Sequence, residues 1–389
     1  MARFHHGETP VARAHILLGP AVLVSALVGT AALSVIASSH VTPQPAARTT
    51  GAVTTAKASA TRTSAAKTPG WRIVASFPAV GGIPVSGTLA ANSAADAWSV
   101  LTGPKFAAVY RWTGKAWAKV PLNSKVTPYV RSAVAFAGDS ASDFWLFSFY
   151  RRTEAVHWTG NAWRISAIPS WVLPKGARGA DAAVFGPDDV WVFSLGAGAY
   201  AAHDNGHGWA KVKLTGAVSE VGAVAANDIW ALAGKVALHW NGRAWAAIKI
   251  PSAAGKPPES FGYLSATGPK SAWVWRTLLL PGTRSVAEIL HWNGTNWQPT
   301  AATPADIIYS AVADGAGGLW ATGLDINPGG FANFYHLTGS RWTQAGNPAG
   351  VWNHAPEYLT WIPGTRSLWG VANGVTAKGL DTVILKYGA

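Results

Sequence analysis

The chain has 389 residues, of which 49% are hydrophobic and 13% are charged, so it can bury a large core. It contains no cysteine, which excludes disulfide bonds, thiolate metal sites and lipidated cysteine anchors. The net charge of +13 would attract polyanions, but no dense basic run is interleaved with stacking aromatic residues. We therefore interpret the charge as a solvated basic surface and expect no nucleic-acid binding.

The first predicted element along the chain is an uncharged stretch of 22 residues, 16–37. About 20 apolar residues suffice to cross a bilayer as a helix. Arg3 and Arg13 precede the stretch, as the positive-inside rule requires of an N-terminus left in the cytoplasm. We expect residues 1–15 to be cytoplasmic and residues 16–37 to be an uncleaved signal anchor. The alternative is a signal peptide cleaved at the small-residue site 35–37, which would give a secreted protein.

Residues 38–69 form the next predicted segment, rich in Ala, Thr, Ser and Pro and without a single aromatic residue. Such a composition cannot bury a hydrophobic core. We expect a disordered, extended linker between the membrane and a folded domain.

The remaining residues, 70–389, repeat one sequence pattern with a period of about 45 residues. Each copy contains an x-x-W strand; the seven tryptophans are Trp98, Trp145, Trp191, Trp230, Trp273, Trp320 and Trp369. The first six copies continue with a hairpin phrase: RWTGKAW, HWTGNAW, HDNGHGW, HWNGRAW, HWNGTNW and HLTGSRW. The seventh copy reads KYGA and stops before its hairpin is complete. The segment GWRIVASFP at 70–78 has the character of the missing strand.

These repeats predict an all-β fold, a seven-bladed β-propeller over residues 70–389. Four antiparallel strands in 40–50 residues are typical of one propeller blade. The 42 glycines, 24 prolines and 22 tryptophans agree with many short strands joined by turns. We expect the strand around Trp71 to complete the last blade beside Lys386 and Tyr387, because this closure protects the edge strands.

The two tryptophans of each hairpin phrase have a geometric explanation. In Trp240 to Trp245, Asn-Gly is a strong hairpin signal, with either a two-residue Gly-Arg turn or a four-residue loop. Both turns place Trp240 opposite Trp245 on one face of the sheet. We expect such cross-strand pairs to pack against the neighbouring sheet rather than to bind a ligand.

The repeat resembles the bacterial Trp-rich propeller repeats of the form W-x-V-G…I-x-H-x-D/N-G-x-x-W, which are grouped with kelch and galactose-oxidase-like propellers. The resemblance covers residues 70–389 and implies the propeller fold. It implies no particular function, because propellers serve as binding modules, scaffolds and enzymes. The tyrosine radical of galactose oxidase needs a cysteine, which this chain lacks. We expect no cofactor.

Five histidines recur in the repeat: His157, His203, His239, His291 and His336, with Arg111 and Lys386 in the other copies. Metal ligands must converge on one ion at about 2 Å, whereas equivalent positions on separate blades diverge. We expect structural histidines that hydrogen-bond to Asp96, Asp143, Asp189 or Asp228 where such an aspartate is present. We expect no metal site.

Residues that depart from the repeat are the candidates for function. The starts of the innermost strands ring one mouth of a propeller channel, together with the loops that join the second and third strands. The candidate ligand-binding residues on this face are Tyr129, Arg131, Tyr150, Arg152, Trp171, Arg178, Asp181, Glu220, Glu259, Trp275, Arg276, Tyr309, Trp352 and His354. Exposed aromatic side chains mixed with arginines and carboxylates suit sugar rings or a protein partner.

The first functional hypothesis is a membrane-tethered, extracytoplasmic and monomeric propeller that binds an envelope glycan or a protein partner. The second is a polysaccharide-acting hydrolase or lyase with Glu220, Glu259 or Asp181 as the acid or base. No nucleophile elbow, zinc-binding helix or phosphate-binding loop is visible, so we name no catalytic residue.

Overall fold

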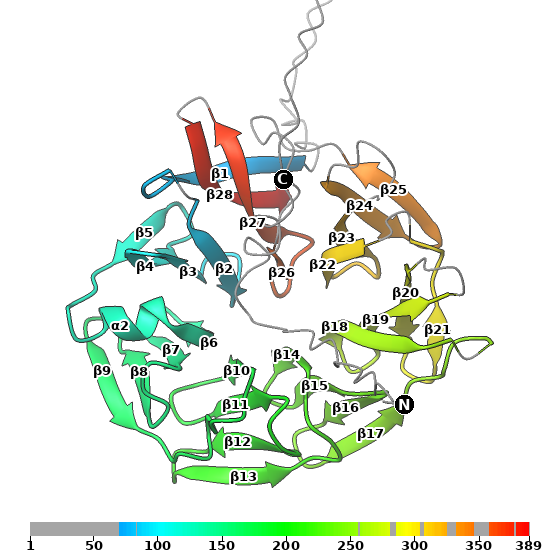
Figure 1. The fold of residues 1–389 in the computed structure, drawn as a ribbon, viewed down its shortest axis with the longest axis horizontal. Coiled ribbons are helices and arrows are strands. Elements are labelled where there is room, and N and C mark those ends of the chain that lie inside the picture. The colour runs from blue at the N-terminus through cyan, green and yellow to red at the C-terminus, as the bar shows by residue number, and fades with distance from the viewer. Residues whose placement is uncertain are drawn as a thin grey trace, which may run out of the picture.

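A computed structural model describes residues 70–388, except for 83, 256, 281–284, 304–306, 325–331, 346–357 and 377–378. Seven four-stranded antiparallel sheets are arranged as blades around a central axis (Figure 1). The all-β, seven-bladed propeller is therefore confirmed. The predicted cytoplasmic segment, signal anchor and linker lie outside the described residues. Within those residues, no helix has the length and apolar character needed to cross a membrane.

The first four blades follow one another along the chain, each with its innermost strand first. Blade 1 has β2 (Ser86–Ala91), β3 (Ala97–Gly103), β4 (Phe106–Trp112) and β5 (Trp117–Val120). Blade 2 has β6 (Ala133–Ser140), β7 (Asp143–Ser148), β8 (Glu154–Trp158) and β9 (Trp163–Ala167). Blade 3 has β10 (Gly179–Val184), β11 (Val190–Leu195), β12 (Tyr200–Asp204) and β13 (Trp209–Lys213). Blade 4 has β14 (Glu220–Ala225), β15 (Asp228–Ala233), β16 (Val236–Trp240) and β17 (Trp245–Lys249).

The other three blades complete the ring. Blade 5 has β18 (Glu259–Gly268), β19 (Ser271–Leu279), β20 (Ser285–Trp292) and β21 (Trp297–Pro299). Blade 6 has β22 (Ile307–Ala313), β23 (Leu319–Leu324), β24 (Ala332–Thr338) and β25 (Arg341–Ala345). Blade 7 has β26 (Tyr358–Trp361), β27 (Leu368–Thr376), β28 (Gly379–Gly388) and, as its outermost strand, β1 (Gly70–Pro78).

The strand β1 closes the ring by pairing antiparallel with β28. Trp71 lies opposite Tyr387, and Arg72 lies opposite Lys386, as predicted from the incomplete seventh copy. The Trp71 ring stacks on Phe334 of blade 6, with 4.9 Å between ring centroids. The first described strand of the chain therefore joins blade 7 and packs against blade 6 as well.

The cross-strand tryptophan pairs lie between blades, as expected. Trp240 pairs directly with Trp245, with 5.8 Å between the ring centroids, and both rings contact Trp191 of blade 3. Four residues join the pair, and the backbone N–H of Asn241 donates to the Ala244 carbonyl. Gly242 lies within this loop at a φ of 89°, a conformation that favours glycine.

The repeated histidines are structural, also as expected. The Asp143 carboxylate accepts a hydrogen bond from His157 Nε2 at 2.6 Å, and the imidazole stacks on Trp145. Other blades repeat this arrangement: His203 with Asp189, His239 with Asp228, and His336 with Asp314. His291 contacts Ser271 instead. In blade 1 the ion pair of Arg111 with Asp96 takes the same place.

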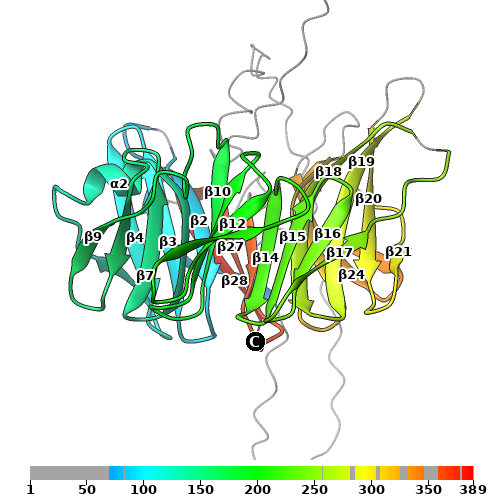
Figure 2. The same ribbon diagram turned by 90° about the horizontal axis from the view of Figure 1, so that it is seen from below.

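Among the described residues one helix interrupts the all-β pattern, and the repeat gave no sign of it. The helix α2 (Thr127–Arg131) connects β5 to β6, with Pro128 in its first turn. The Asn123 side chain begins this segment by accepting hydrogen bonds from the backbone N–H groups of Lys125 and Val126. In the side view, α2 lies near one end of the blades (Figure 2). It places Tyr129 and Arg131 at the face where the innermost strands begin.

Candidate ligand-binding site at the channel mouth

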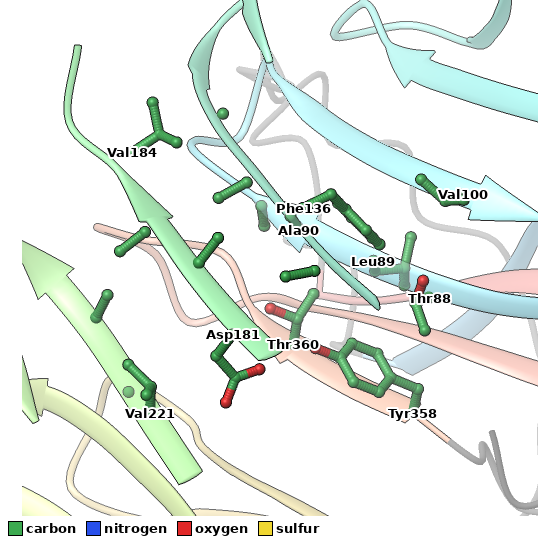
Figure 3. A pocket seen from close by; sticks show the side chains of 18 of the residues that line it. Thr88, Leu89, Ala90, Val100, Phe136, Asp181, Val184, Val221, Tyr358 and Thr360 are labelled. Atoms are coloured by element: carbon green, nitrogen blue, oxygen red, sulfur yellow. The ribbon is translucent and has the colours of Figure 1, made fainter. Parts of the chain in front are cut away.

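A cavity of about 1030 Å³ runs along the axis of the propeller. It is lined from Arg131 and Arg178, near the starts of the innermost strands, to Asn92 and Pro363 beyond their ends. Each innermost strand is the edge of its sheet, so backbone N–H and C=O groups that have no partner strand face the cavity. Small residues such as Ala90 keep it open (Figure 3).

Two carboxyl side chains lie close enough to interact electrostatically near one end of this cavity, which Asp181 lines. Asp181 is on β10 of blade 3, and Glu220 is the first residue of β14 in the adjacent blade 4. The backbone N–H of Val221, on the edge strand β14, donates a hydrogen bond to the Asp181 carboxylate. Neither carboxyl group forms an ion pair with a lysine or arginine in the part of the chain that the structure describes.

The surroundings of this pair favour its protonated form. Burial raises the pKa of Asp181 to about 7, although the hydrogen bond from Val221 acts in the opposite direction. Burial and the negative charge of Asp181 raise the pKa of Glu220 to about 8. Near neutral pH the pair therefore holds a proton, so it can donate as well as accept hydrogen bonds.

Two tyrosines stand beside the carboxyl pair. Tyr358 on β26 is 37% exposed, and its side chain points into the same space as Asp181 (Figure 3). Tyr263 on β18 is 40% exposed and stacks on Trp275, with 4.4 Å between centroids. Burial and the charge of Glu220 raise the pKa of Tyr263 to about 12. Burial, Asp181 and Glu220 raise the pKa of Tyr358, so both phenols remain hydrogen-bond donors.

Neither tyrosine is among the site residues predicted from the sequence. Tyr263 lies within an irregularity in the pairing of β18 with β19, between Phe261 and Leu264, which disturbs the alternation of side chains. Tyr358 begins a strand of only four residues, and the spacing from Trp369 pointed to positions earlier in the chain. The sequence did contain one signal that could have identified them: each is an aromatic residue in an innermost strand, and the innermost strands are otherwise rich in Ala, Gly and Val.

Three predicted site residues belong instead to the packing within blade 5. The Arg276 side chain is 3% exposed and forms ion pairs with Glu259 at 2.9 Å and Glu288 at 2.5 Å. Lys235 also contacts Glu259. Burial opposes the ionisation of Glu259, yet Lys235, the Ala253 N–H group and Arg276 together hold its pKa below the usual value. The expectation that Glu259, Arg276 and Trp275 are exposed is therefore not met; Trp275 is 3% exposed.

A second group of predicted residues lies on the same face over blades 2 and 3. Tyr129 is buried and donates a hydrogen bond to Glu154, and burial and Glu154 raise its pKa to about 12. Tyr150 is 51% exposed and meets the Tyr129 ring edge-on. Arg152 donates to the Pro174 carbonyl at 2.7 Å and covers the Phe149 ring.

The remaining candidates are spread around the mouth. Trp171 is half-buried, and its carbonyl accepts a hydrogen bond from the Tyr200 hydroxyl at 2.7 Å. Arg131 and Arg178 are exposed and line the cavity with Asp181. Tyr309 is half-buried on β22, where burial raises its pKa. Trp352 and His354 lie outside the described residues. No three His, Asp or Glu side chains within the described ranges gather as a metal site would require.

No protein-family profile and no curated protein matches the chain. Solved structures do match. YCF48 from Cyanidioschyzon merolae has a TM-score of 0.50 at 12% identity, over 82% of this chain and 98% of that one. The β-propeller domain of Myceliophteria thermophila Cps50 (Swd1) has a TM-score of 0.51 at 10% identity, over 81% and 99%.

The extracellular domain of the putative one-component system BT4673 from B. thetaiotaomicron also matches. Its TM-score is 0.52 at 11% identity, and the match covers 81% of this chain and 40% of that one. These similarities show the fold alone. The likeness to kelch and galactose-oxidase-like repeats stays a prediction.

Proposed function

We propose that the protein is a binding module whose partner enters the mouth of the central channel. The partner is a segment of a protein or a glycan that carries amino or hydroxyl groups. The observation that carries this proposal is the pairing of Asp181 and Glu220, without an ion pair to a described lysine or arginine, beside Tyr263 and Tyr358. Asp181 and Tyr358 line the cavity of about 1030 Å³.

Such a pair of carboxyl groups is costly unless a ligand binds to it. Carboxyl groups withdrawn from water lose hydration, and Glu259 shows the usual solution, which is pairing with Lys235 and Arg276. Asp181 and Glu220, by contrast, form no ion pair with a described lysine or arginine, which leaves them for a ligand beside two exposed phenols. Tyrosine rings add apolar surface and a hydroxyl at a low cost in conformational entropy.

A solved propeller of similar fold supports a peptide as one kind of partner. YCF48 bound to D1 peptide has a TM-score of 0.50 at 14% identity, over 80% of this chain and 99% of that one. Innermost edge strands offer free backbone groups to an extended peptide as well as to sugar hydroxyls. Separate peptide and glycan arms are therefore needed in the test.

The test uses the full chain in a non-sugar, nonionic polyoxyethylene detergent on a peptide library and a glycan array. The double variant Asp181→Asn with Glu220→Gln should weaken binding to the selected ligand by about tenfold or more. The control variant Asp188→Asn with Asp204→Asn removes two charges at the opposite face and should keep the affinity. Equal affinities of all three proteins for every selected ligand would contradict the proposal.

The second candidate function is hydrolysis or elimination on a polysaccharide, and the raised pKa values of Asp181 and Glu220 favour it. A carboxylic acid protonated near neutral pH is what a general acid requires. Glu259 is not suited to this role because it is buried and paired. Turnover of a glycan by the unmodified chain, lost in Asp181→Asn or Glu220→Gln while binding persists, would favour the enzyme.

We further propose that residues 16–37 tether the propeller to a membrane, with residues 1–15 inside and the linker 38–69 outside. Net apolarity over 22 residues and the preceding arginines support this placement. Carbonate extraction should leave the full chain in the membrane pellet and a chain without 16–37 in the supernatant. Recovery of a shortened chain in the medium would show a cleaved signal peptide instead.

A further inference from the structure

The outer edges of blades 1 to 4 carry a continuous series of basic residues. The outermost strands β5, β9, β13 and β17 follow one another around the rim of the molecule (Figure 1). They contain no acidic residue. Their exposed cations, which we call the basic rim, are Lys119, Arg164, Lys211, Lys213 and Lys249.

Nothing in the described structure neutralises the basic rim. None of its cations forms an ion pair with a described residue. Lys211 instead lies 5.1 Å from the Trp171 ring centroid and 4.9 Å from that of Tyr200. The repeated aspartates of these blades do not neutralise the rim, because they bond to residues within the blades; Asp143, for example, binds His157. The outermost strands of blades 1 to 4 therefore carry positive charge that no ion pair with a described residue compensates.

We propose that the basic rim binds a flexible anionic polysaccharide. The cations are distributed along a convex edge rather than gathered on one flat face. A flexible chain can follow that edge and meet four blades, whereas a flat bilayer touches a convex rim along a narrow line. Duplex DNA, with a persistence length of about 50 nm, would have to bend sharply to do the same.

A single-stranded nucleic acid is flexible, but it is recognised through aromatic side chains that stack on its bases. The tryptophans of the four outermost strands are half-buried between blades. Trp163, for example, donates its Nε1 hydrogen to the Pro121 carbonyl at 2.7 Å. The rim thus offers charge without free stacking surfaces, which favours a polymer recognised through its carboxylate or sulfate groups. The basic rim lies on the outermost strands, not on the innermost strands that line the cavity, although Lys211 contacts Trp171 near the mouth face. The proposal does not depend on the proposed function.

The test measures the affinity of the full chain for polygalacturonate, in polyoxyethylene detergent, at several salt concentrations. The rim variant changes all five rim cations to Gln. A matched turn variant changes five exposed cations to Gln at the hairpin-turn face, which lies opposite the channel mouth. These cations are Lys115, Arg243, Lys270, Arg341 and Arg366. Both variants lose the same net charge, so they separate a binding surface from a general charge effect.

The rim variant should bind polygalacturonate at least about tenfold more weakly, and its dependence on salt should become shallower. The turn variant should stay within about threefold of the unmodified chain. Changing the four rim lysines to Arg should preserve binding, which guards against a folding defect. Neutral dextran should bind none of these proteins.

Two results would overturn the proposal. The first is an equal loss of affinity in the rim and turn variants, because binding would then follow net charge alone. The second is rim-dependent binding of single-stranded poly-dT, or of micelles doped with phosphatidylglycerol, that is tighter than binding of polygalacturonate. The rim would then serve a nucleic acid or an anionic membrane.

Discussion

At the scale of single residues, the partners of a glutamate decide whether it stabilises the fold or is a candidate for binding a ligand. Glu259 and Glu220 both stand at the start of an innermost strand. Lys235 and Arg276 neutralise Glu259, whereas Glu220 has Asp181 beside it. The difference appears in the pKa values, which are lowered for Glu259 and raised for Glu220. Departure from the repeat marks both residues, but only Glu259 is neutralised by ion pairs with described residues.

The carboxyl pair predicts a pH-dependent stability. Because the folded-state pKa values of Asp181 and Glu220 are raised to about 7 and about 8, the folded protein binds more protons than the unfolded chain between about pH 4 and pH 8. The contribution of the pair to the free energy of unfolding therefore falls as the pH rises through that window. Asp181→Asn with Glu220→Gln should remove this loss.

The measurement is thermal unfolding of the full chain at pH 4.5 and pH 8.5. The double variant should match the unmodified chain at pH 4.5 and be more stable by about 1–3 kcal/mol at pH 8.5, since channel water screens part of the effect. The Asp188→Asn, Asp204→Asn control should show no such gain at high pH. A variant that is less stable at pH 8.5 would show that the pair stabilises the fold.

Single residues also show where sequence reasoning about the site stops. Asp181 and Glu220 were identified because they depart from the repeat at the starts of innermost strands. The same criterion selected Glu259, and Arg276 was selected as a departure near a loop between second and third strands. A sequence does not show that Lys235 of blade 4 reaches Glu259 of blade 5. Tyr263 was missed because an irregular strand pairing shifts its orientation.

At the scale of strands and hairpins, the repeat predicts the architecture because the repeated tryptophans of one blade pack against the neighbouring blade. The Trp240–Trp245 pair belongs to blade 4, yet its rings contact Trp191 of blade 3. The sequence spacing fixes such pairs through the strand register, so they could be predicted in detail. The helix α2 could not, because it occurs once and replaces an ordinary connection.

The hairpin tryptophans should therefore stabilise the fold in proportion to their contacts between blades. Trp245→Ala removes ring contacts with Trp240, Trp191 and Phe193. We expect a loss of about 2–4 kcal/mol, toward the lower end because the side chain is half-buried. Urea unfolding measures the loss. Trp171→Ala, which removes a tryptophan outside the repeat, should cost less; an equal cost would contradict the role assigned to the pair.

At the scale of the whole molecule, the ring depends on its first described strand. The pairing of β1 with β28 joins residues separated by more than 300 positions, for example Arg72 and Lys386. This closure was predictable because the seventh repeat lacks the strand that residues 70–78 supply. The identity of the partner was not, because the fold is shared by propellers with different ligands.

Engineered cysteines can test the closure cleanly, since the chain has none of its own. Arg72→Cys with Lys386→Cys places two thiols on directly paired residues. Oxidation should form a disulfide that raises the free energy of unfolding by about 2–4 kcal/mol. Arg72→Cys with Lys119→Cys, on another blade, should not cross-link. A failure of the first pair to cross-link would place β1 elsewhere.

The most direct test of the binding account is hydrogen exchange of the full chain with and without a ligand selected on the peptide or glycan array. The innermost strands present backbone N–H groups to the channel without a partner strand. Those that no side chain binds, unlike the N–H groups of Val221 and Leu359, exchange rapidly until a ligand covers them. We predict slower exchange at the starts of β10, β14, β18 and β26, around Asp181, Glu220, Tyr263 and Tyr358. Slowed exchange confined to the outer strands or the hairpin turns would contradict a binding site at the channel mouth.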